Sequence, residues 1–229
     1  MPLTRSRMQR QLLQLDTAVL SDAMGKTGAL DHDIKCLSAN PRMAGPAYTV
    51  RVHTADILMV GAALSQCPSG HVLVIDGQGE LNTALWGELT TLAALRKRVA
   101  GVVVDGALRD SLNISRSRLP VFARAIVPNA GGAEYVGELN VTVQCGGQVV
   151  RPGDWMAGDE DGVVVIPAER LSATIAAAKQ IVAIEKELER AIRRGADLGQ
   201  LLRLQEVIER KTSEGFIPQM RAAKRRPAR

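Results

Sequence analysis

The chain has 229 residues, of which 46% are hydrophobic and 23% are charged, as is typical of a globular protein. A chain of this length buries roughly 70% of the surface that its unfolded form exposes, so it can form a core without disulfides. No apolar run approaches the ~20 residues of a membrane helix, and no secretory signal is visible, so we expect a cytoplasmic protein.

The net charge of +5 belongs to one end of the chain. Residues 221–229, RAAKRRPAR, contain five basic residues, and the rest of the chain has 24 basic and 24 acidic residues. A nucleic-acid-binding face needs clustered basic residues with aromatic side chains, but aromatic residues are only 3% of this sequence. We expect residues 220–229 to be a solvated, disordered tail rather than a phosphate-binding patch, and we do not expect nucleic acid as a partner.

In chain order, the first half alternates helical and strand patterns. These patterns predict helices over 8–15 and 17–25, an irregular stretch over 27–44, a strand over 45–53, a helix over 54–66, a strand over 71–76, a helix over 87–98 and a buried strand over 99–105. Leu89, Leu92, Ala93 and Leu95 form the apolar side of the helix at 87–98. The last three elements predict a βαβ unit.

The second half is expected to be more antiparallel and to end in helices. Strand patterns recur at 120–125, 141–145, 148–151 and 162–166. Gly146 and Gly147 stand between two of these runs and suit a tight hairpin turn. Residues 168–193 lack Gly and Pro and predict a long helix, and 197–212 predict another. These helices have no further strands to cover, so we expect an outer layer or a contact with a neighbouring subunit.

The cysteines and histidines do not form a metal-binding pattern. The three cysteines lack a CxxC pair, and the three histidines lack HxH or HxxxH spacing. The odd number of cysteines fits a reducing compartment. A metal site in this chain would therefore use carboxylates and water, which favour a hard ion such as Mg²⁺ or Mn²⁺.

The segment DGQGELN, 76–82, does not indicate a nucleotide cofactor. Gly77 and Gly79 approach the GxGxxG fingerprint, but Asn82 stands where the third glycine belongs. We predict a turn there and exclude a nicotinamide or methyl-donor cofactor. We expect structural roles for Asp76 and Asp159 as acceptors of backbone hydrogen bonds, and for Trp86 and Trp155 as packing residues or pocket walls.

Charged residues at the ends of the βαβ unit form the candidate site. The residues that open its helix are Gly87, Glu88, Leu89 and Thr90. Free N–H groups at a helix start attract a carboxylate. After the next strand, Arg109 offers a fork for a carboxylate and Asp110 offers hard oxygen ligands. Each segment alone is better explained as an ordinary surface, with Glu88 as a first-turn acid. If they meet at one sheet edge, they form a site for a metal-bound oxo acid.

Several motifs in this order resemble the regulator of ribonuclease activity A family, whose catalytic members are class II pyruvate aldolases. The resemblance runs from about Leu15 to Pro167 and includes LDTAVLSDAMGKTG, VLVIDGQGELNTALWGE, AGVVVDGALRD, LPVFARAIVP and VTVQCGGQVVRPGDWMAGDEDGVVVIP. An acid, 20 residues and an Arg-Asp pair form the family's catalytic signature, which Glu88, Arg109 and Asp110 match. Some relatives that bind and inhibit a ribonuclease lack the Arg-Asp pair.

The resemblance implies an α/β fold, an α-β-β-α sandwich with a mixed sheet, that assembles as a homotrimer or homohexamer with sites between subunits. We accordingly divide the chain into an aldolase-like core over 1–167, a C-terminal helical extension over 168–219, in the same domain or as a subunit contact, and the tail. Some aldolase members place a glutamate from a neighbour's C-terminal helix near the metal, and Glu185 is the candidate here. The alternative is that the helix emerges into solvent at that position.

The implied function is a divalent-metal-dependent aldolase. It would cleave 4-hydroxy-4-methyl-2-oxoglutarate, or a related 4-hydroxy-2-oxo acid, to pyruvate and a second oxo acid, with oxaloacetate decarboxylation as a side activity. Asp110 and water would hold Mg²⁺ or Mn²⁺, Arg109 would stabilise the enolate, and the N–H groups of residues 88–90 would hold the pyruvyl carboxylate. Glu88 would orient water or relay a proton. The alternatives are a non-catalytic ribonuclease-regulator-like binding protein and an enzyme acting on a different oxo or hydroxy acid.

Overall fold

The computed structural model describes residues 4–213, so the expected tail at 220–229 lies outside the described residues. The chain forms two compact units that divide after Lys179. The first unit contains every strand and the first two turns of a long helix, whose buried residues all lie before the division. Within residues 4–213, no helix has the length and apolarity needed to cross a membrane.

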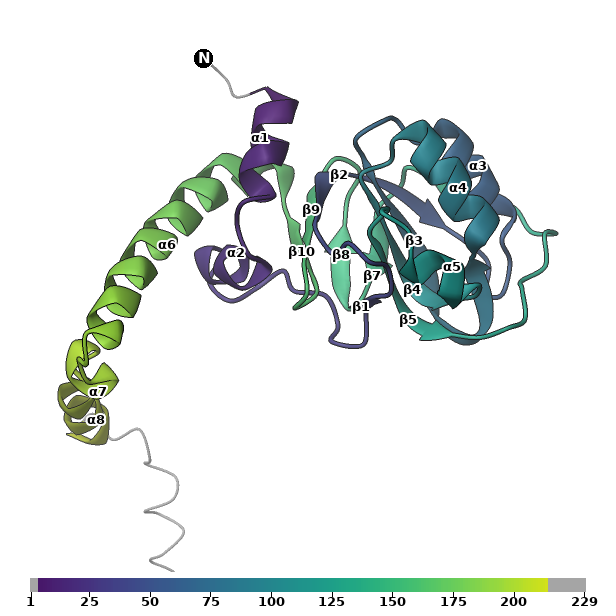
Figure 1. Ribbon diagram of the computed structural model, residues 1–229. Coiled ribbons are helices and arrows are strands. Elements are labelled where there is room, and N and C mark those ends of the chain that lie inside the picture. The colour runs from purple at the N-terminus through teal and green to yellow at the C-terminus, as the bar shows by residue number, and fades with distance from the viewer. Residues whose placement is uncertain (1–3, 214–229) are drawn as a thin grey trace, which may run out of the picture. The chain divides into compact units, whose positions relative to one another are not determined.

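Figure 1 labels the helices and strands and colours them by residue number. The helices of the first unit are α1 (Arg5–Leu12), α2 (Thr17–Ala23), α3 (Leu58–Gln66), α4 (Glu88–Lys97), α5 (Ser111–Ser115), the 3₁₀ turn η1 (Ala168–Arg170) and the start of α6 (Leu171–Arg193). The strands are β1 (Lys35–Cys36), β2 (Met43–Arg51), β3 (Val72–Trp86), β4 (Gly101–Leu108), β5 (Val121–Ile126), β6 (Glu138–Leu139), β7 (Val143–Cys145), β8 (Gln148–Val150), β9 (Trp155–Gly158) and β10 (Val163–Ile166). The second unit contains the rest of α6, then α7 (Leu198–Leu201) and α8 (Leu204–Ser213).

A mixed sheet organises the first unit. Its strand order is β1-β5-β4-β3-β2-β9-β10, with β6 beside β2, and β7 and β8 form a separate hairpin. The four central strands pair in parallel, and the outer pairs are antiparallel. The mixed α/β fold with C-terminal helices confirms the expected fold class. Because neighbouring parallel strands end at one edge, the loops after β3 and β4 lie side by side.

Both faces of the sheet are buried. Alternation along β3 sends Leu73 and Ile75 to one face and Val72 and Val74 to the other. The first face packs against α3, α4 and α5 (Figure 1). The second face packs against the β7–β8 hairpin and, because the sheet curls, against the sheet's own strands β9 and β10. A parallel sheet covered on both faces keeps its strands continuously apolar, which explains the run that the sequence shows in β4.

The prediction of which side of α4 faces the core is wrong. The residues proposed for it, Leu89, Leu92, Ala93 and Leu95, are all exposed. Thr91 and Ala94 face the core instead. Thr91 can be buried because its hydroxyl accepts the Trp86 indole N–H at 2.8 Å and donates to the Gly87 carbonyl at 2.9 Å. The fold therefore leaves a row of leucines on the outer side of α4.

Strand β3 is longer than expected. It continues past Asp76 to Trp86, and the expected turn lies inside it as an irregularity in its pairing with β4. Gln78 and Gly79 have φ values of 58° and 72°, which a turn requires. Asp76 accepts the backbone N–H groups of Gln78 and Gln144, as expected of a structural residue.

Other differences concern short or irregular elements. The two-residue strands β1 and β6 are too short to show a periodic pattern, and β9 (sequence WMAG) lacks β-branched residues. The helix expected over 54–66 begins only at Leu58, because the chain turns at Ala55, where φ is 60°. The helix expected over 197–212 is divided by Arg203, where φ is 50°.

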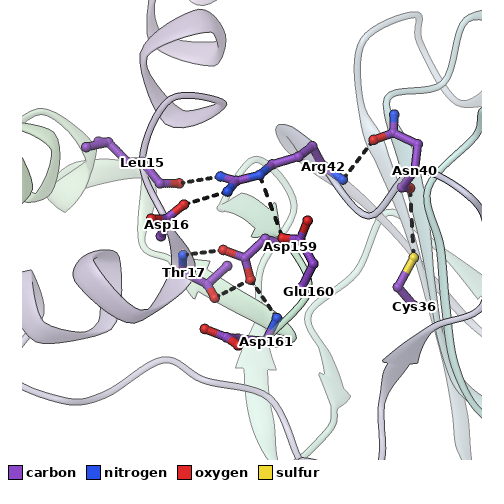
Figure 2. A network of polar contacts seen from close by, with 9 residues as sticks. All are labelled: Leu15, Asp16, Thr17, Cys36, Asn40, Arg42, Asp159, Glu160 and Asp161. Atoms are coloured by element: carbon purple, nitrogen blue, oxygen red, sulfur yellow. Dashed lines mark hydrogen bonds and ion pairs between the residues drawn. The ribbon is translucent and has the colours of Figure 1, made fainter.

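Asp159, directly after β9, connects the start of α2 to the sheet. Its side chain accepts the Thr17 N–H at 2.7 Å, the Thr17 hydroxyl at 2.6 Å and the Asp161 N–H at 3.0 Å (Figure 2). Arg42 lies beside this group and bonds Asp16 at 2.5 Å. Asp159 is only 3% exposed, so its carboxylate caps the start of α2 from 142 residues away in the chain.

We predict that Asp159→Asn lowers the free energy of unfolding by about 2 kcal/mol. The amide nitrogen would face one of the N–H or O–H donors and leave it unpaired. Urea denaturation at a fixed protein concentration measures the change. Glu160→Gln is the matched control, because Glu160 is exposed and lies 3.9 Å from Arg42, so we expect a change within about 0.5 kcal/mol. Equal stability of the two variants would contradict the capping role of Asp159.

Candidate active site

The two predicted site segments meet at the carboxyl edge of the sheet. Strand β3 ends at Trp86, β4 ends at Leu108, and these two residues are partners in the ladder. The Arg109 N–H donates to the Trp86 carbonyl at 2.9 Å, which extends the pairing by one residue. The start of α4 and the Arg109-Asp110 pair are therefore neighbours.

A direct hydrogen bond joins the segments. The Asp110 Oδ2 atom accepts the backbone N–H of Glu88 at 2.9 Å, and the Arg109 Nε atom lies 3.8 Å from the same oxygen. A carboxylate at the start of a helix is stabilised by the free N–H groups and the helix dipole. The Glu88 N–H is therefore occupied, in contrast to the expectation that it binds a substrate carboxylate. The N–H groups of Leu89 and Thr90 have no acceptor among residues 4–213.

Asp110 has an unusual backbone conformation. Its φ and ψ values are 59° and 36°, in the left-handed region that aspartate tolerates better than most residues. Strained conformations of this kind cluster at functional sites. The conformation directs Oδ2 to α4, and Oδ1 has no partner within the described part of the chain. Oδ1 and the Glu88 carboxylate, which also has no partner in residues 4–213, are the oxygens that could bind a cation.

The two segments line a cavity of about 200 Å³. Its walls are Ile57, Val60, Gly61, Ala84, Leu85, Trp86, Gly87, Glu88, Leu89, Thr90, Arg109, Asp110 and Ala130. An apolar pocket with a few convergent polar groups is the usual form of a small-molecule site. Trp86 is one of its walls, as the sequence predicted.

Asp56 positions part of this cavity and was not found by sequence reasoning. It accepts the N–H groups of Leu58 at 2.9 Å, Glu134 at 2.7 Å and Tyr135 at 3.1 Å, so it holds the loop that follows Ala130. Burial opposes its ionisation, but the three donors outweigh this effect and hold its pKa below the ordinary value of 3.8. Its contribution to stability is therefore present above that value and is lost as the pH falls through the folded pKa. Its sequence signal is that of an ordinary turn before a helix.

The oxygens at the site suit a hard divalent cation. Two carboxylates and water are a common donor set for Mg²⁺, which keeps several of its waters and binds few protein ligands. Among residues 4–213, the one cluster of three close potential ligands is elsewhere, at Asp31, His32 and Asp33 on the surface. A cation at Asp110 would therefore need water or another molecule for its remaining ligands.

Glu185, the residue expected from a neighbouring subunit, is exposed on the second unit of the chain. It lies beside Leu188 and Ile192 at the edge of an apolar groove within that unit. The buried residues of α6 end at Ala178, so the apolar stripe does not continue buried to Glu185.

Comparison with known proteins identifies the family of this fold and site. A family model described as "RraA-like: Aldolase/RraA" matches residues 17–165, which include both site segments. The chain belongs to the RraA-like family.

Its relatives carry two kinds of name. A provisionally named 4-hydroxy-4-methyl-2-oxoglutarate aldolase of Halalkalibacterium halodurans is 37% identical over 80% of this chain and 87% of its own. The 4-hydroxy-4-methyl-2-oxoglutarate aldolase of Thermus thermophilus is 35% identical over 68% of this chain and 94% of its own. A solved structure titled as the RNA-processing inhibitor RraA from Thermus thermophilus has a TM-score of 0.62 and is 36% identical, over 66% of this chain and 92% of its own. The names of these similar proteins therefore include both an aldolase and an RNA-processing inhibitor.

Gly87 should be required at the site for a steric reason. Its φ is −161°, so alanine is allowed by the backbone, but a Cβ would lie 2.7 Å from Asp110 Oδ2 and 3.3 Å from Arg109 Cγ. We predict that Gly87→Ala displaces both side chains and lowers turnover by about 100-fold, the size of effect that a misplaced catalytic group has.

The melting temperature should fall by only a few degrees, because Gly87 is not in the core. Gly61→Ala is the control, because it lines the same cavity and its Cβ would meet nothing within 4 Å. Equal activity of the Gly87→Ala variant and the wild type would show that the Asp110 position is not critical.

Proposed function

We propose that this protein is an aldolase that cleaves 4-hydroxy-4-methyl-2-oxoglutarate or a related 4-hydroxy-2-oxo acid into pyruvate and a second oxo acid. The observation that carries the proposal is the contact between the Asp110 carboxylate and the start of α4, beside Arg109, in one cavity. The proposal is supported by the N–H groups, the guanidinium and the carboxylates that line one cavity of about 200 Å³.

The open N–H groups of Leu89 and Thr90 would bind the carboxylate of the pyruvyl half. They lie in the first turn of α4, where the helix dipole adds to the attraction of an anion. Arg109 would stabilise the negative charge that develops on the 2-oxo group when the carbon–carbon bond breaks. Arg109 lines the same cavity as the start of α4, so it would contact that oxygen while the carboxylate remains on the helix.

Carboxylates would hold a divalent cation and move protons. Asp110, through Oδ1, is the residue that would hold Mg²⁺ or Mn²⁺, and a bound cation would supply Lewis-acid polarisation of the 2-oxo group. Glu88 would orient water or relay a proton to or from the substrate, because its side chain lines the cavity. Oxaloacetate decarboxylation passes through the same enolate of pyruvate, so we expect it as a side activity.

A second candidate function is a binding protein that regulates a ribonuclease. Its support is the similarity to the RNA-processing inhibitor of Thermus thermophilus. That function has no evident use for the strained Asp110 or for the polar groups that converge on the cavity, so we prefer the aldolase.

We predict that pyruvate release from a panel of 4-hydroxy-2-oxo acids requires a divalent cation and Asp110. Chelation removes the cation, and Asp110→Asn removes the carboxylate that would hold it. Either change should lower kcat/KM by on the order of 100-fold or more, because the positive charge of the cation no longer opposes the developing anion. Asparagine tolerates the left-handed backbone, so the fold should remain. Asp22→Asn, at an exposed position of α2, is the control. Full turnover after exhaustive chelation would refute the metal-dependent mechanism.

We propose further that the protein is a homotrimer or homohexamer and that the outer face of α4 lies at a subunit interface. Leu89 and Leu92 are 78% and 54% exposed, and Leu112, at the other end of the site, is 63% exposed. An apolar surface of this kind around a site usually marks an interaction surface. A neighbouring subunit would then complete the site, and Glu185 is the residue we propose for that contribution.

Leu92→Asp should therefore dissociate the assembly and lower activity at the same time. Light scattering coupled to gel filtration measures the mass at micromolar concentration. Leu13→Asp is the matched control, since Leu13 is a half-exposed leucine of the N-terminal segment, far in sequence from the site. A wild-type protein that is an active monomer would refute the shared site.

A further inference from the structure

One peptide group at the start of α4 connects the candidate site to the buried interior. Its N–H, which belongs to Glu88, donates to Asp110 Oδ2 at 2.9 Å. Its carbonyl, which belongs to Gly87, accepts the Thr91 N–H at 3.1 Å and the Thr91 hydroxyl at 2.9 Å. A trans peptide group is planar, so its N–H and its C=O point in opposite directions. The bonds that orient the Gly87 carbonyl therefore also direct the Glu88 N–H at Asp110.

The Thr91 hydroxyl is itself held in one orientation. A threonine hydroxyl has one proton to donate and can also accept, whereas an indole N–H can only donate. The Trp86 indole N–H occupies the hydroxyl oxygen at 2.8 Å, so the hydroxyl proton is directed to the Gly87 carbonyl. Thr91 and Trp86 are 4% and 2% exposed, and water does not compete for these bonds. The indole, the hydroxyl and the peptide group thus form a series of hydrogen bonds that ends at Asp110.

Trp86 also holds the second segment of the site. Its backbone carbonyl accepts the Arg109 N–H at 2.9 Å, and its side chain is a wall of the cavity. One residue therefore binds the Arg109-Asp110 segment through its backbone and the first turn of α4 through its side chain. This arrangement fixes the two segments relative to each other from the buried side.

We infer that Thr91 is a positioning residue of the candidate site: with Trp86, it orients this peptide group so that Asp110 and the open N–H groups of the first turn face one ligand. The inference rests on the proposed function, in which these groups bind a cation and the carboxylate of an oxo acid. Thr91 lies outside the lining of the cavity, so it acts through the peptide group and not by touching the ligand.

Oxalate is a suitable probe, because its adjacent carboxylates present the same pair of oxygens as the enolate of pyruvate. Titration calorimetry of the full-length protein in Mg²⁺ buffer measures its affinity. Thr91→Val keeps the shape of the side chain and removes the hydroxyl, so we expect oxalate to bind about tenfold more weakly, the effect of one lost orienting hydrogen bond. Thr91→Ser keeps the hydroxyl and should bind oxalate within about twofold of the wild type.

A second variant makes the result independent of how well valine is tolerated in α4. Thr91→Ala also removes the hydroxyl, and alanine is the residue that most favours a helix. It should weaken oxalate binding by about the same factor as Thr91→Val. Melting temperatures show that each variant is folded.

Thr49→Val is the matched control. Thr49 is fully buried in β2, its hydroxyl donates to the Val141 carbonyl at 2.5 Å, and it lies outside the lining of the cavity. Its loss leaves a backbone carbonyl without the hydroxyl and should lower the melting temperature by a few degrees, as Thr91→Val does. The affinity for oxalate should remain that of the wild type, because this bond does not reach the site.

The outcomes separate this inference from the proposed function. If the wild type binds oxalate and both hydroxyl-free variants bind it as tightly, the positioning role of Thr91 is wrong and the aldolase proposal remains. The role is also wrong if Thr49→Val weakens binding as much as Thr91→Val, or if Thr91→Ser binds as weakly as Thr91→Val. If the wild type does not bind oxalate in Mg²⁺ buffer, the proposed function fails, and this inference fails with it.

Discussion

The hydrogen bond from the Glu88 N–H to the Asp110 carboxylate is the constraint on which the site depends. It connects the end of β3 and the start of α4 to the end of β4. It also determines which groups have no partner among residues 4–213, namely Oδ1 of Asp110 and the N–H groups of Leu89 and Thr90. It also explains the glycine at position 87, because any Cβ there would meet Oδ2. The left-handed backbone of Asp110 directs its carboxylate to this partner.

The sheet supplies the rigidity that this bond requires. The pairing of Trp86 with Leu108 continues into the Arg109 N–H bond, so the two loops leave the sheet from adjacent ladder positions. Apolar layers cover both faces of the sheet, and Asp159, directly after β9, fixes the start of α2 to the sheet. Site residues on the ends of a buried sheet are held more closely than residues on free loops.

Much of this site could be predicted from local pattern. The apolar strands on either side of a helix predicted adjacent parallel strands, and their shared edge places Glu88 near Arg109 and Asp110. The orientation of α4 could not be predicted, because the burial of Thr91 depends on a bond to Trp86 that periodicity does not show. The wall of the cavity at Ala130 could not be predicted either. Asp56 holds the loop after Ala130 through a hydrogen bond from the Glu134 N–H, 78 residues away in the chain. Such contacts depend on which segments meet in space, and local propensity does not encode that.

The proposed aldolase activity requires Arg109 and the groups around it to stabilise the enolate of pyruvate. Exchange of the pyruvate methyl protons for deuterium reports enolate formation without any need for the complete substrate, and proton NMR in D₂O with Mg²⁺ follows it directly. The wild-type protein should accelerate the exchange saturably above the rate in buffer with Mg²⁺ alone, and the Arg109→Ala variant should not. An exchange rate equal to that of the buffer, with pyruvate at saturating concentration, would contradict enolate stabilisation by this protein.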